Sequence, residues 1–340
     1  MLDDLDRQII GVLHLLPRAS WDEVASVVSV DASTVSRRYS RLVADNVLRV
    51  VGELSWTTYS TTYPVHLRIQ THSASPARIL DDLAALPQTI HVASTYGLYP
   101  LFATIHAASE QETGDVLQDI YGMDGVSSIM TLPILTFGSK GSRWDPQLLT
   151  DPQREACRVL AMAAGEPATG DSTQAIPSSG MDPVEKRALS LLQREGRLSA
   201  SRLARELGMA NSTAQRMIRR FMDHQWFTPR VEIDGAYLGF EAPFVLSVKT
   251  SLDSAGEVAR SLTEHPALRF VSQVASEYNM FCTGMARDRE HLAQLINEDF
   301  GALPGVRDIS VDLFLTEAKR FWMSRGNGQT LNEFSPPPLV

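Results

Sequence analysis

The chain contains the stretch Ser33-Thr34-Val35-Ser36-Arg37-Arg38-Tyr39-Ser40-Arg41, and 179 residues later it contains Ser212-Thr213-Ala214-Gln215-Arg216-Met217-Ile218-Arg219-Arg220. The correspondence runs without a gap over residues 2–49 and 181–228, where Asp3 matches Asp182 and Arg18 matches Arg197. A repeat of this length indicates duplicated domains and not a solenoid. The sequence is therefore interpreted as two copies of one unit of about 140 residues.

The first part of each copy is predicted to be helical. Apolar residues at helical spacing are followed by turn residues, and this pattern recurs three times before a short strand. In copy one, the predicted elements are a helix containing Leu5 to Leu13, helices Trp21–Val28 and Ser33–Ala44, and a strand Val47–Val51. In copy two, the predicted helices are Val184–Glu195, Ala200–Leu207 and Ser212–His224. Gly208 suits a turn that needs positive φ, and Asn211 is predicted to cap the third helix.

The second part of each copy reads strand, helix, strand, strand, helix, strand. In copy one these elements are His66–Thr71, Ala77–Leu86, Thr89–Ser94, Leu101–His106, Gln111–Ile120 and Val126–Phe137. In copy two they are Pro243–Thr250, Asp253–Glu264, Leu268–Ala275, Met280–Ala286, Arg289–Phe300 and Val306–Thr316. This order is the βαββαβ, ferredoxin-like arrangement. Its helices cover one face of an antiparallel sheet, so we expect the second copy to cover the other face.

The expected fold class is α+β, with two winged helix-turn-helix domains alternating with two ferredoxin-like domains. The expected boundaries are 1–55, 60–140, 181–235 and 240–322 for the four domains. Residues 141–180 are expected to form a connector, with a helix over Pro152–Ala164 and a flexible linker over Gly165–Gly180 that is rich in Gly, Pro, Ser and Thr. Residues 323–340 are expected to be a tail, disordered around Ser335 to Pro338.

Composition excludes several classes of protein. The chain has 340 residues, 44% of them hydrophobic and 21% charged, which is typical of a globular protein. Its two cysteines are far apart and do not form a disulfide framework. It has no apolar run long enough to span a bilayer, and acids stand where a signal peptide carries Lys or Arg. These features predict a cytoplasmic protein without a membrane segment.

The predicted third helices carry positive charge in a chain of net charge -9. Ser33–Ala44 and Ser212–Met222 each hold three arginines and no acid, as expected of a helix that enters a groove of double-stranded DNA. The candidate base-reading residues are Ser33, Thr34, Ser36 and Arg37 in copy one and Asn211, Ser212, Thr213, Gln215 and Arg216 in copy two, with Arg38, Arg41, Arg219 and Arg220 as candidate phosphate ligands. The alternative is that these arginines form a solvated face or pair with acids elsewhere.

The two copies differ in charge. Residues 1–55 contain six Lys and Arg against eight acids, a net charge of -2, whereas residues 181–235 contain ten against seven, a net charge of +3. We therefore expect copy two to bind DNA more strongly. A pair of such helices predicts a pseudo-palindromic site whose half-sites need not be identical.

The order of motifs resembles the Lrp/AsnC (feast/famine) family of transcriptional regulators. The resemblance is carried by Leu5-Asp6-x-x-Ile9-Ile10-x-x-Leu13, Leu191-Leu192-x-x-Glu195-Gly196-Arg197-Leu198, Leu203-Ala204-x-x-Leu207-Gly208-Met209 and Leu303-Pro304-Gly305-Val306. It implies a DNA-binding N-terminal domain and a C-terminal domain, called RAM, that mediates dimerisation and binds small effectors, commonly amino acids. It also implies homo-oligomers assembled through the ferredoxin-like domains. This chain looks like a covalent fusion of two such units.

The family's effector loop resembles Gly-Asp-x-Asp between the second and third strands of the C-terminal domain. The corresponding residues here are Ser94, Thr95, Tyr96 and Gly97 in copy one and Ser276, Glu277, Tyr278 and Asn279 in copy two. Copy one lacks both acids, whereas copy two keeps Glu277. The resemblance thus implies an amino-acid effector at copy two more than at copy one, and the alternative is a loop without a ligand.

No catalytic or metal-binding motif is present in the sequence, so no catalytic residue, metal or cofactor is expected. One enzymatic alternative remains, because some proteins of Lrp-like architecture are tetrapyrrole (siroheme) decarboxylases that use His and Arg in the C-terminal domain. His66, His91 and His106 lie on or near predicted strands of copy one. The simpler interpretation is that they are ordinary sheet residues.

Overall fold

The computed structural model describes residues 2–58, 60–72, 76–139, 141, 144–164, 181–326 and 330–336, so the predicted linker lies outside the described residues. Two compact units are formed. The helical unit contains the described residues up to 58 and from 144 to 238, and the barrel unit contains those from 60 to 141 and from 239 to 336. Each unit therefore combines the corresponding parts of both copies.

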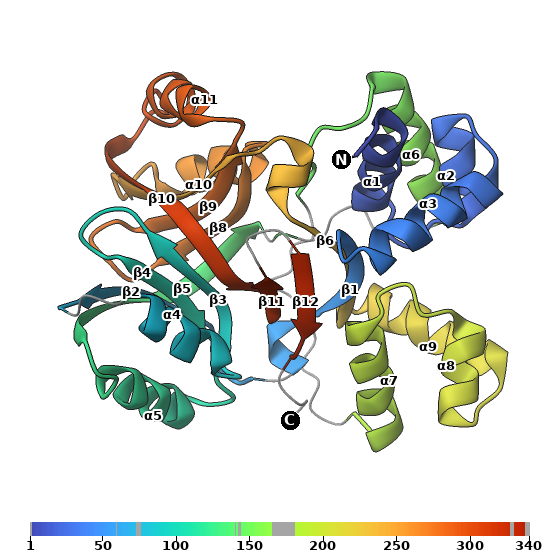
Figure 1. Cartoon of the computed structure of the whole chain (residues 1–340), viewed down its shortest axis with the longest axis horizontal. Coiled ribbons are helices and arrows are strands. Elements are labelled where there is room, and N and C mark those ends of the chain that lie inside the picture. The colour runs from blue at the N-terminus through green and yellow to red at the C-terminus, as the bar shows by residue number, and fades with distance from the viewer. Residues whose placement is uncertain are drawn as a thin grey trace. The chain divides into compact units, whose positions relative to one another are not determined.

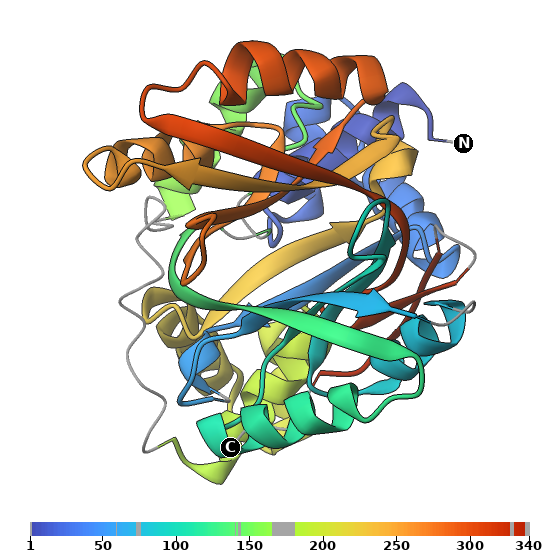
Figure 2. The same ribbon diagram turned by 90° about the vertical axis from the view of Figure 1, so that its left-hand side faces the viewer.

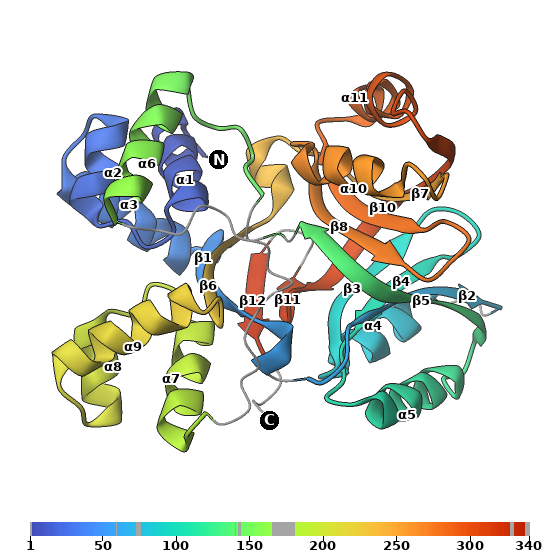
Figure 3. The same cartoon turned by 180° about the vertical axis from the view of Figure 1, so that it is seen from behind.

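The helical unit contains the predicted helices and the predicted copy-one strand, with ends that shift by a few residues, and it adds a copy-two strand that the sequence did not predict. Copy one supplies α1 (Asp4–Leu15), α2 (Trp21–Val28), α3 (Ala32–Ala44), β1 (Leu48–Leu54) and a 3-10 turn at Trp56–Thr58. Copy two supplies α7 (Pro183–Arg194), α8 (Ala200–Leu207), α9 (Asn211–Asp223), β6 (Phe227–Ile233) and a 3-10 turn at Gly235–Leu238. The connector helix is α6 (Asp151–Ala164), and it packs on α1 and α2 (Figure 3).

Local capping chemistry explains where these helices begin. The first helix of each copy starts with a capping box, in which Asp3 and Asp6, or Asp182 and Glu185, satisfy each other's backbone N–H groups. The predicted positive φ at Gly208 is confirmed at 66°. The predicted cap at Asn211 is wrong, because Ala210 occupies the N-cap and Asn211 is the first residue of α9.

The two helix-turn-helix domains share one two-stranded sheet. Strands β1 and β6 pair antiparallel, and Val51 lies opposite Arg230 at the centre of the register (Figure 1). Residues 51 and 230 are equivalent in the two copies, so a pseudo-two-fold axis passes through this pair. The backbones come close here, since a Cβ on Gly196 would lie 2.4 Å from the carbonyl oxygen of Val51. Only glycine fits at this crossing.

A reciprocal pair of arginines reinforces this sheet. Arg18 donates from Nη1 and Nη2 to the carbonyl oxygens of Gly196 and Leu198 at 2.5 and 2.9 Å. Its equivalent, Arg197, donates to the carbonyl oxygens of Pro17 and Ala19, both at 2.6 Å. Residues 17 and 19 are the equivalents of 196 and 198, so the contact is isologous, as in a symmetric dimer.

A buried ion triad lies on the pseudo-two-fold axis. Arg230 Nη1 lies 2.9 Å from Glu53 Oε2, and Arg230 Nε lies 2.5 Å from Glu232 Oε1. Glu53 and Glu232 are equivalent residues, whereas the equivalent of Arg230 is Val51. Burial opposes the charge of Arg230, but the two carboxylates outweigh it and raise the pKa of the guanidinium. Removing one member of such a group leaves an uncompensated buried charge, which typically costs about 3–5 kcal/mol.

The barrel unit contains two βαββαβ sets. Copy one supplies β2 (Val65–Thr71), α4 (Pro76–Ala85), β3 (Thr89–Thr95), β4 (Leu101–Ile105), α5 (Glu110–Tyr121) and β5 (Val126–Ser139). Copy two supplies β7 (Ala242–Thr250), α10 (Ala255–Glu264), β8 (Leu268–Val274), β9 (Met280–Ala286), α11 (Arg289–Gln294), a π-helical turn at Leu295–Phe300 and β10 (Val306–Arg320). The predicted helix over Arg289–Phe300 therefore changes to π geometry in its second half.

The two sheets close into a barrel with the strand order β10-β3-β4-β2-β5-β8-β9-β7, in which β7 pairs again with β10. The last strand of each copy crosses to the other copy, because β5 pairs with β8 and β10 pairs with β3. In Figure 2 the helices of the two copies lie on opposite outer faces of this barrel. The expectation that copy two covers the open face of the copy-one sheet is confirmed.

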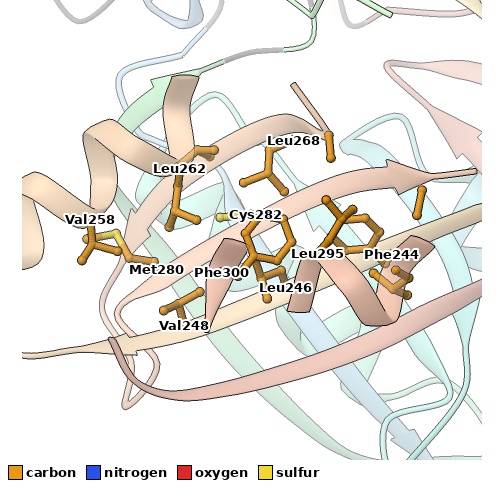
Figure 4. Packing of buried hydrophobic residues seen from close by; sticks show 14 of the residues in the cluster. Phe244, Leu246, Val248, Val258, Leu262, Leu268, Met280, Cys282, Leu295 and Phe300 are labelled. Atoms are coloured by element: carbon orange, nitrogen blue, oxygen red, sulfur yellow. The ribbon is translucent and has the colours of Figure 1, made fainter. Parts of the chain in front are cut away.

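Alternate strand residues face the outer helices and form one hydrophobic cluster per copy. In copy two, Phe244, Leu246 and Val248 of β7 pack with Val258 and Leu262 of α10 (Figure 4). In copy one, residues of β2, β3 and β4 pack in the same way with α4 and α5. The cores therefore lie between sheet and helices, and the other strand face points into the barrel.

The predicted tail is partly structured. Strands β11 (Met323–Gly326) and β12 (Thr330–Phe334) extend the sheet beyond β10. Trp322 is almost fully buried, and its backbone N–H donates to the carbonyl oxygen of Ile90. The expectation that everything after residue 322 is a tail is therefore wrong for these two strands. Ser335 follows them and donates its N–H to the carbonyl oxygen of Trp322.

The barrel interior holds histidines and an ion cluster. His66 stacks on Phe281 with ring centroids 4.1 Å apart, and its Nδ1 lies 2.8 Å from Thr104 Oγ1. Burial lowers the pKa of His66 to about 3. His91 Nε2 lies 2.7 Å from Glu317 Oε1, and Arg320 Nη1 lies 3.0 Å from Glu317 Oε2. Burial opposes ionisation of Glu317, but Arg320 and His91 outweigh it and hold its pKa well below the usual range.

Replacing Arg197 by alanine is expected to lower the free energy of unfolding by about 2 kcal/mol, because two charge-assisted hydrogen bonds and the contact with Trp21 are lost. Urea unfolding followed by far-UV circular dichroism measures this change. Arg205→Ala, which removes an exposed arginine of α8, is the control and should change stability by less than about 0.5 kcal/mol. Equal losses in the two variants would contradict the structural role of Arg197.

The buried His66 predicts loss of stability in mild acid. Its pKa is about 3 in the folded state and near 6.5 when unfolded, so below pH 6.5 only the unfolded state gains the proton. Between pH 7.5 and 5.5, the free energy of unfolding should fall by about 1.4 kcal/mol more in the natural chain than in His66→Phe. Urea unfolding at the two pH values tests this, with the exposed His72→Gln as control. A pH dependence unchanged by His66→Phe would refute the assignment.

Candidate nucleic-acid interface

The third helix of each helix-turn-helix domain, α3 or α9, carries the predicted DNA-binding residues. A left-handed residue, Ser29 in copy one and Gly208 in copy two, ends the second helix and turns the chain into the third. Val35 of α3 and Ala214, Ile218 and Phe221 of α9 are buried against the rest of their domains. The opposite faces of both helices therefore remain at the surface.

The predicted base-reading residues lie on these surface faces. Ser33, Arg37, Asn211, Ser212, Gln215 and Arg216 are exposed, and Thr34, Ser36 and Thr213 are half-buried. Neither α3 nor α9 has a side chain that caps its N-terminus. The first turns of both helices thus present small polar side chains at the surface. Such a face is suited to contact with base edges and phosphates.

Both predicted phosphate ligands of copy one form ion pairs with acids of their own domain. Arg38 Nη1 lies 2.5 Å from Asp3 Oδ2 and 3.0 Å from Asp6 Oδ1, and Arg41 Nη2 lies 2.6 Å from Asp6 Oδ2. Asp6 is only 1% exposed. The hydrogen bonds to Asp3 and Asp6 raise the pKa of Arg38. These arginines thus join α3 to the start of α1, which was the alternative that the sequence left open.

Copy two repeats one of these contacts. Arg220, the equivalent of Arg41, forms an ion pair with Glu185, the equivalent of Asp6. Sequence reasoning missed Asp6 and Glu185 as partners of the arginines. The signal was available, because an acid at the third position of the first helix and an arginine in the third helix recur at the same offset of 179 residues.

Three arginines of the third helices are uncommitted, which here means exposed and without an ion pair or side-chain hydrogen bond to the described residues. Arg37 of α3 and Arg216 and Arg219 of α9 are exposed, and within the described part of the chain they have no ion pair or side-chain hydrogen bond. The surface is therefore unequal, with one such arginine on the third helix of copy one and two on that of copy two.

The predicted effector loops lie in the barrel unit. In copy one, Thr95 Oγ1 donates to the carbonyl oxygen of Tyr99 at 2.5 Å, and Tyr96 donates its N–H to the carbonyl oxygen of Leu313 in β10. Ser94 is half-buried, and Gly97 is exposed with a φ of 107°. The copy-one loop is thus held against the last strand of copy two.

The copy-two loop is held by its own copy. Tyr278 donates its hydroxyl to Asp308 at 2.5 Å, and Asn279 Oδ1 accepts from the N–H of Thr250 at 2.9 Å. Ser276 donates its N–H to the carbonyl oxygen of Val274. Glu277 lies 2.7 Å from Lys249 Nζ, with the carboxylate side chain 74% exposed. Glu277 and Lys249 therefore form the accessible charged pair of this loop.

The described residues also bear on three other kinds of feature: metal sites, membrane-spanning helices and reactive cysteines. Among them, no group of three His, Cys, Asp or Glu side chains is arranged to hold a metal ion. No helix in the described part of the chain is long and apolar enough to cross a membrane. Both cysteines are buried, and burial raises the pKa of each thiol.

Three family models match parts of the chain. The AsnC-type helix-turn-helix domain matches residues 2–43, and the winged helix-turn-helix DNA-binding domain matches residues 181–226. A C-terminal dimeric alpha+beta barrel domain matches residues 236–324. These matches agree with the helical unit and with the copy-two part of the barrel.

The relatives of similar sequence are about as long as one copy of the repeat. An HTH-type transcriptional regulator of Pyrococcus abyssi is 26% identical over 133 residues, which are 38% of this chain and 84% of that protein. The HTH-type transcriptional regulator Ptr1 of Methanocaldococcus jannaschii is 25% identical over 140 residues, 41% of this chain and 95% of that protein. One unit of this chain therefore corresponds to nearly a whole relative.

A solved structure extends the similarity to both copies of the repeat. The siroheme decarboxylase NirDL superposes with a TM-score of 0.61 over 94% of this chain and 93% of its own, at 13% sequence identity. At this identity the similarity concerns the fold alone. The chain therefore carries AsnC-type and winged helix-turn-helix domains and a C-terminal dimeric alpha+beta barrel domain, and its duplicated unit is similar to the Lrp/AsnC regulators.

Proposed function

We propose that this chain is a sequence-specific DNA-binding transcriptional regulator. The observation that carries the proposal is the exposed, uncommitted Arg37, Arg216 and Arg219 on two third helices of AsnC type. Uncommitted guanidinium groups on such a helix match phosphates and guanine edges. The two relatives named above, from Pyrococcus abyssi and Methanocaldococcus jannaschii, are HTH-type transcriptional regulators, which supports this function. A cytoplasmic location is part of the proposal.

In this proposal the DNA-contacting residues lie in the N-terminal halves of the third helices. Gln215 and Arg216 lie on the exposed face of α9, where glutamine can bond adenine and arginine can bond guanine with two hydrogen bonds each. Ser33, Thr34 and Ser36 provide shorter polar contacts on α3. Arg219 supplies a phosphate contact. Arg38, Arg41 and Arg220 instead join the third helices to the first helices through ion pairs with Asp6 and Glu185.

Arg216→Ala is expected to weaken binding to a specific site by about 1–3 kcal/mol, because a bidentate base contact is lost. Fluorescence anisotropy with the chain's own upstream DNA, at two salt concentrations, measures the effect. Arg78→Ala, an exposed arginine of α4 in the barrel unit, is the control and should leave binding unchanged. Binding that is insensitive to salt, or equal in both variants, would sink the proposal for this helix.

We include an amino-acid effector in the proposal, bound at the copy-two loop. Glu277 and Lys249 expose opposite charges 2.7 Å apart, and these charges complement the ammonium and carboxylate of a free amino acid. Tyr278 and Asn279 provide polar groups beside them. The copy-one loop, with Tyr96 and Gly97 exposed, offers no acid and is a weaker candidate.

A thermal-shift screen of the common amino acids tests the effector site. We expect one or a few of them to raise the melting temperature, and Glu277→Gln should abolish the shift because the ammonium loses its counter-charge. Glu257→Gln, an exposed acid of α10, is the matched control. A shift that survives in Glu277→Gln would place the ligand elsewhere.

Further assembly of copies through the ferredoxin-like domains is also proposed. In the last strands the copies match at an offset of 180 residues, where Leu135-Thr136 of β5 corresponds to Leu315-Thr316 of β10. Leu135 and Leu315 are 50% and 52% exposed. Apolar groups at equivalent positions of both copies are suited to contacts between barrels.

A tetrapyrrole decarboxylase of the siroheme type is the second candidate function. It is favoured by the fold shared with NirDL and by His66 Nε2, which is buried without a hydrogen-bond partner among the described residues. Stacking of His66 on Phe281 and pairing of His91 with Glu317 also explain both histidines as structural groups. If the chain fails to bind DNA at low salt, absorbance titration with a tetrapyrrole decides for or against this candidate.

A further inference from the structure

The two third helices are equivalent in sequence position but unequal in available charge. On α3 the cations are Arg37, Arg38 and Arg41, and on α9 they are Arg216, Arg219 and Arg220. By sequence alone the two helices carry the same number of cations, since each has three arginines. The ion pairs of the folded domain show how many of these cations a DNA phosphate can reach.

In copy one, Arg38 and Arg41 are neutralised by a buried acid. Asp6 is 1% exposed and binds both guanidinium groups, at 3.0 and 2.6 Å. If DNA withdrew these arginines, the buried Asp6 carboxylate would lose both of its ion-pair partners, and such a loss costs several kcal/mol. A phosphate contact in water does not offset that cost. Arg37 is therefore the cation of α3 for which no acid of the described domain competes with DNA.

Copy two keeps only one of these two contacts. Met217 stands where copy one has Arg38, and Arg219 stands where copy one has Ser40. Arg220 pairs with Glu185, whose side chain is 15% exposed against 1% for Asp6, whereas Arg220 and Arg41 are similarly exposed at 44% and 51%. Arg216 and Arg219 have no partner within the described part of the chain. The third helix of copy two therefore presents more usable positive charge.

The N-cap residues of α3 and α9 also favour DNA binding by copy two. Asp31 is the N-cap of α3, is exposed, and makes no side-chain hydrogen bond to the helix. Its carboxylate stands at the end of the helix where base and phosphate contacts form, and it repels phosphate there. The equivalent residue in copy two is Ala210, which has no charge.

Copy one is also committed to the interface within the helical unit. Arg197 of copy two lies over the ring of Trp21, 4.0 Å from its centroid, and 5.6 Å from that of Tyr39 in α3. The equivalents of Trp21 and Tyr39 are Ala200 and Ile218, and Arg18 lies instead 6.0 Å from the ring centroid of Phe227 in copy two. The aromatic contacts of the two equivalent arginines are therefore unequal, and the closer ones involve α2 and α3 of copy one.

From these contacts we infer that α9 alone reads bases and that the first helix-turn-helix domain is a scaffold. The DNA target is then a single asymmetric half-site and not a palindrome, since palindromic operators mirror two equivalent reading helices. This inference rests on the proposed DNA-binding function and narrows the pseudo-palindromic site expected from the sequence. It assigns base readout to Gln215 and Arg216 and phosphate contact to Arg219.

The test is selection of sites from a random duplex DNA library with the full chain, followed by affinity measurements on the enriched duplex. We expect one half-site without an inverted repeat. Arg216→Ala should weaken binding roughly tenfold or more, and the matched Arg37→Ala should change it by less than about twofold. Both residues are exposed, so neither substitution should disturb folding.

A gain-of-function variant tests the role of the buried acid. Asp6→Asn keeps the shape of the side chain but removes the carboxylate charge that holds Arg41, while Arg38 keeps its ion pair with Asp3. It should strengthen binding about two- to tenfold and steepen the dependence of affinity on salt, because the Arg41 cation becomes available. Unchanged affinity in a folded Asp6→Asn variant would overturn the argument that Asp6 withholds Arg41.

The remaining outcomes separate the inference from the function beneath it. Enrichment of an inverted repeat, with equal losses in Arg37→Ala and Arg216→Ala, would overturn the single-reader inference and leave DNA binding intact. No enriched sequence and no salt-dependent binding would overturn DNA binding and the inference with it.

Discussion

The reciprocal contact of Arg18 and Arg197 is the interaction on which the helical unit depends. Each guanidinium binds two backbone carbonyls of the other copy, and the same two copies pair through β1 and β6. Both surfaces belong to one chain, so their effective concentration is high and pairing does not depend on protein concentration. The β1–β6 register also positions the two third helices, because each strand follows its helix after a short turn.

Fusion of two copies allows departures from symmetry that a homodimer cannot make. A homodimer carries the same residue at both equivalent positions. Here Arg230 faces its own equivalent, Val51, so that one cation serves the two equivalent carboxylates of Glu53 and Glu232. The barrel shows the same freedom, because Glu317 holds His91 and Arg320 at one junction between copies, whereas the equivalent of Glu317 is Phe137. The duplicated framework is symmetric, and its charged groups are not.

The recognition helices illustrate how far sequence reasoning reaches. The positions and polar character of Ser33, Thr34, Gln215 and Arg216 follow from helical periodicity, which is a local property, and the structure places these residues at the surface. The state of Arg38 and Arg41 does not follow from it. Their partner Asp6 lies more than thirty residues away on α1, and the ion pairs form only when α1 packs beside α3.

The sequence by itself determined the repeat, the order of helices and strands, and the α+β class, because capping residues and apolar spacing act over a few residues. It also placed the turn at Gly208. Tertiary structure alone decided that β1 pairs with β6, that β5 and β10 cross between copies to close the barrel, and that β11 and β12 extend it. It also decided which arginines remain available on α3 and α9. These outcomes depend on contacts between residues far apart in the chain, and local patterns do not specify the partner of a strand edge or of a buried charge.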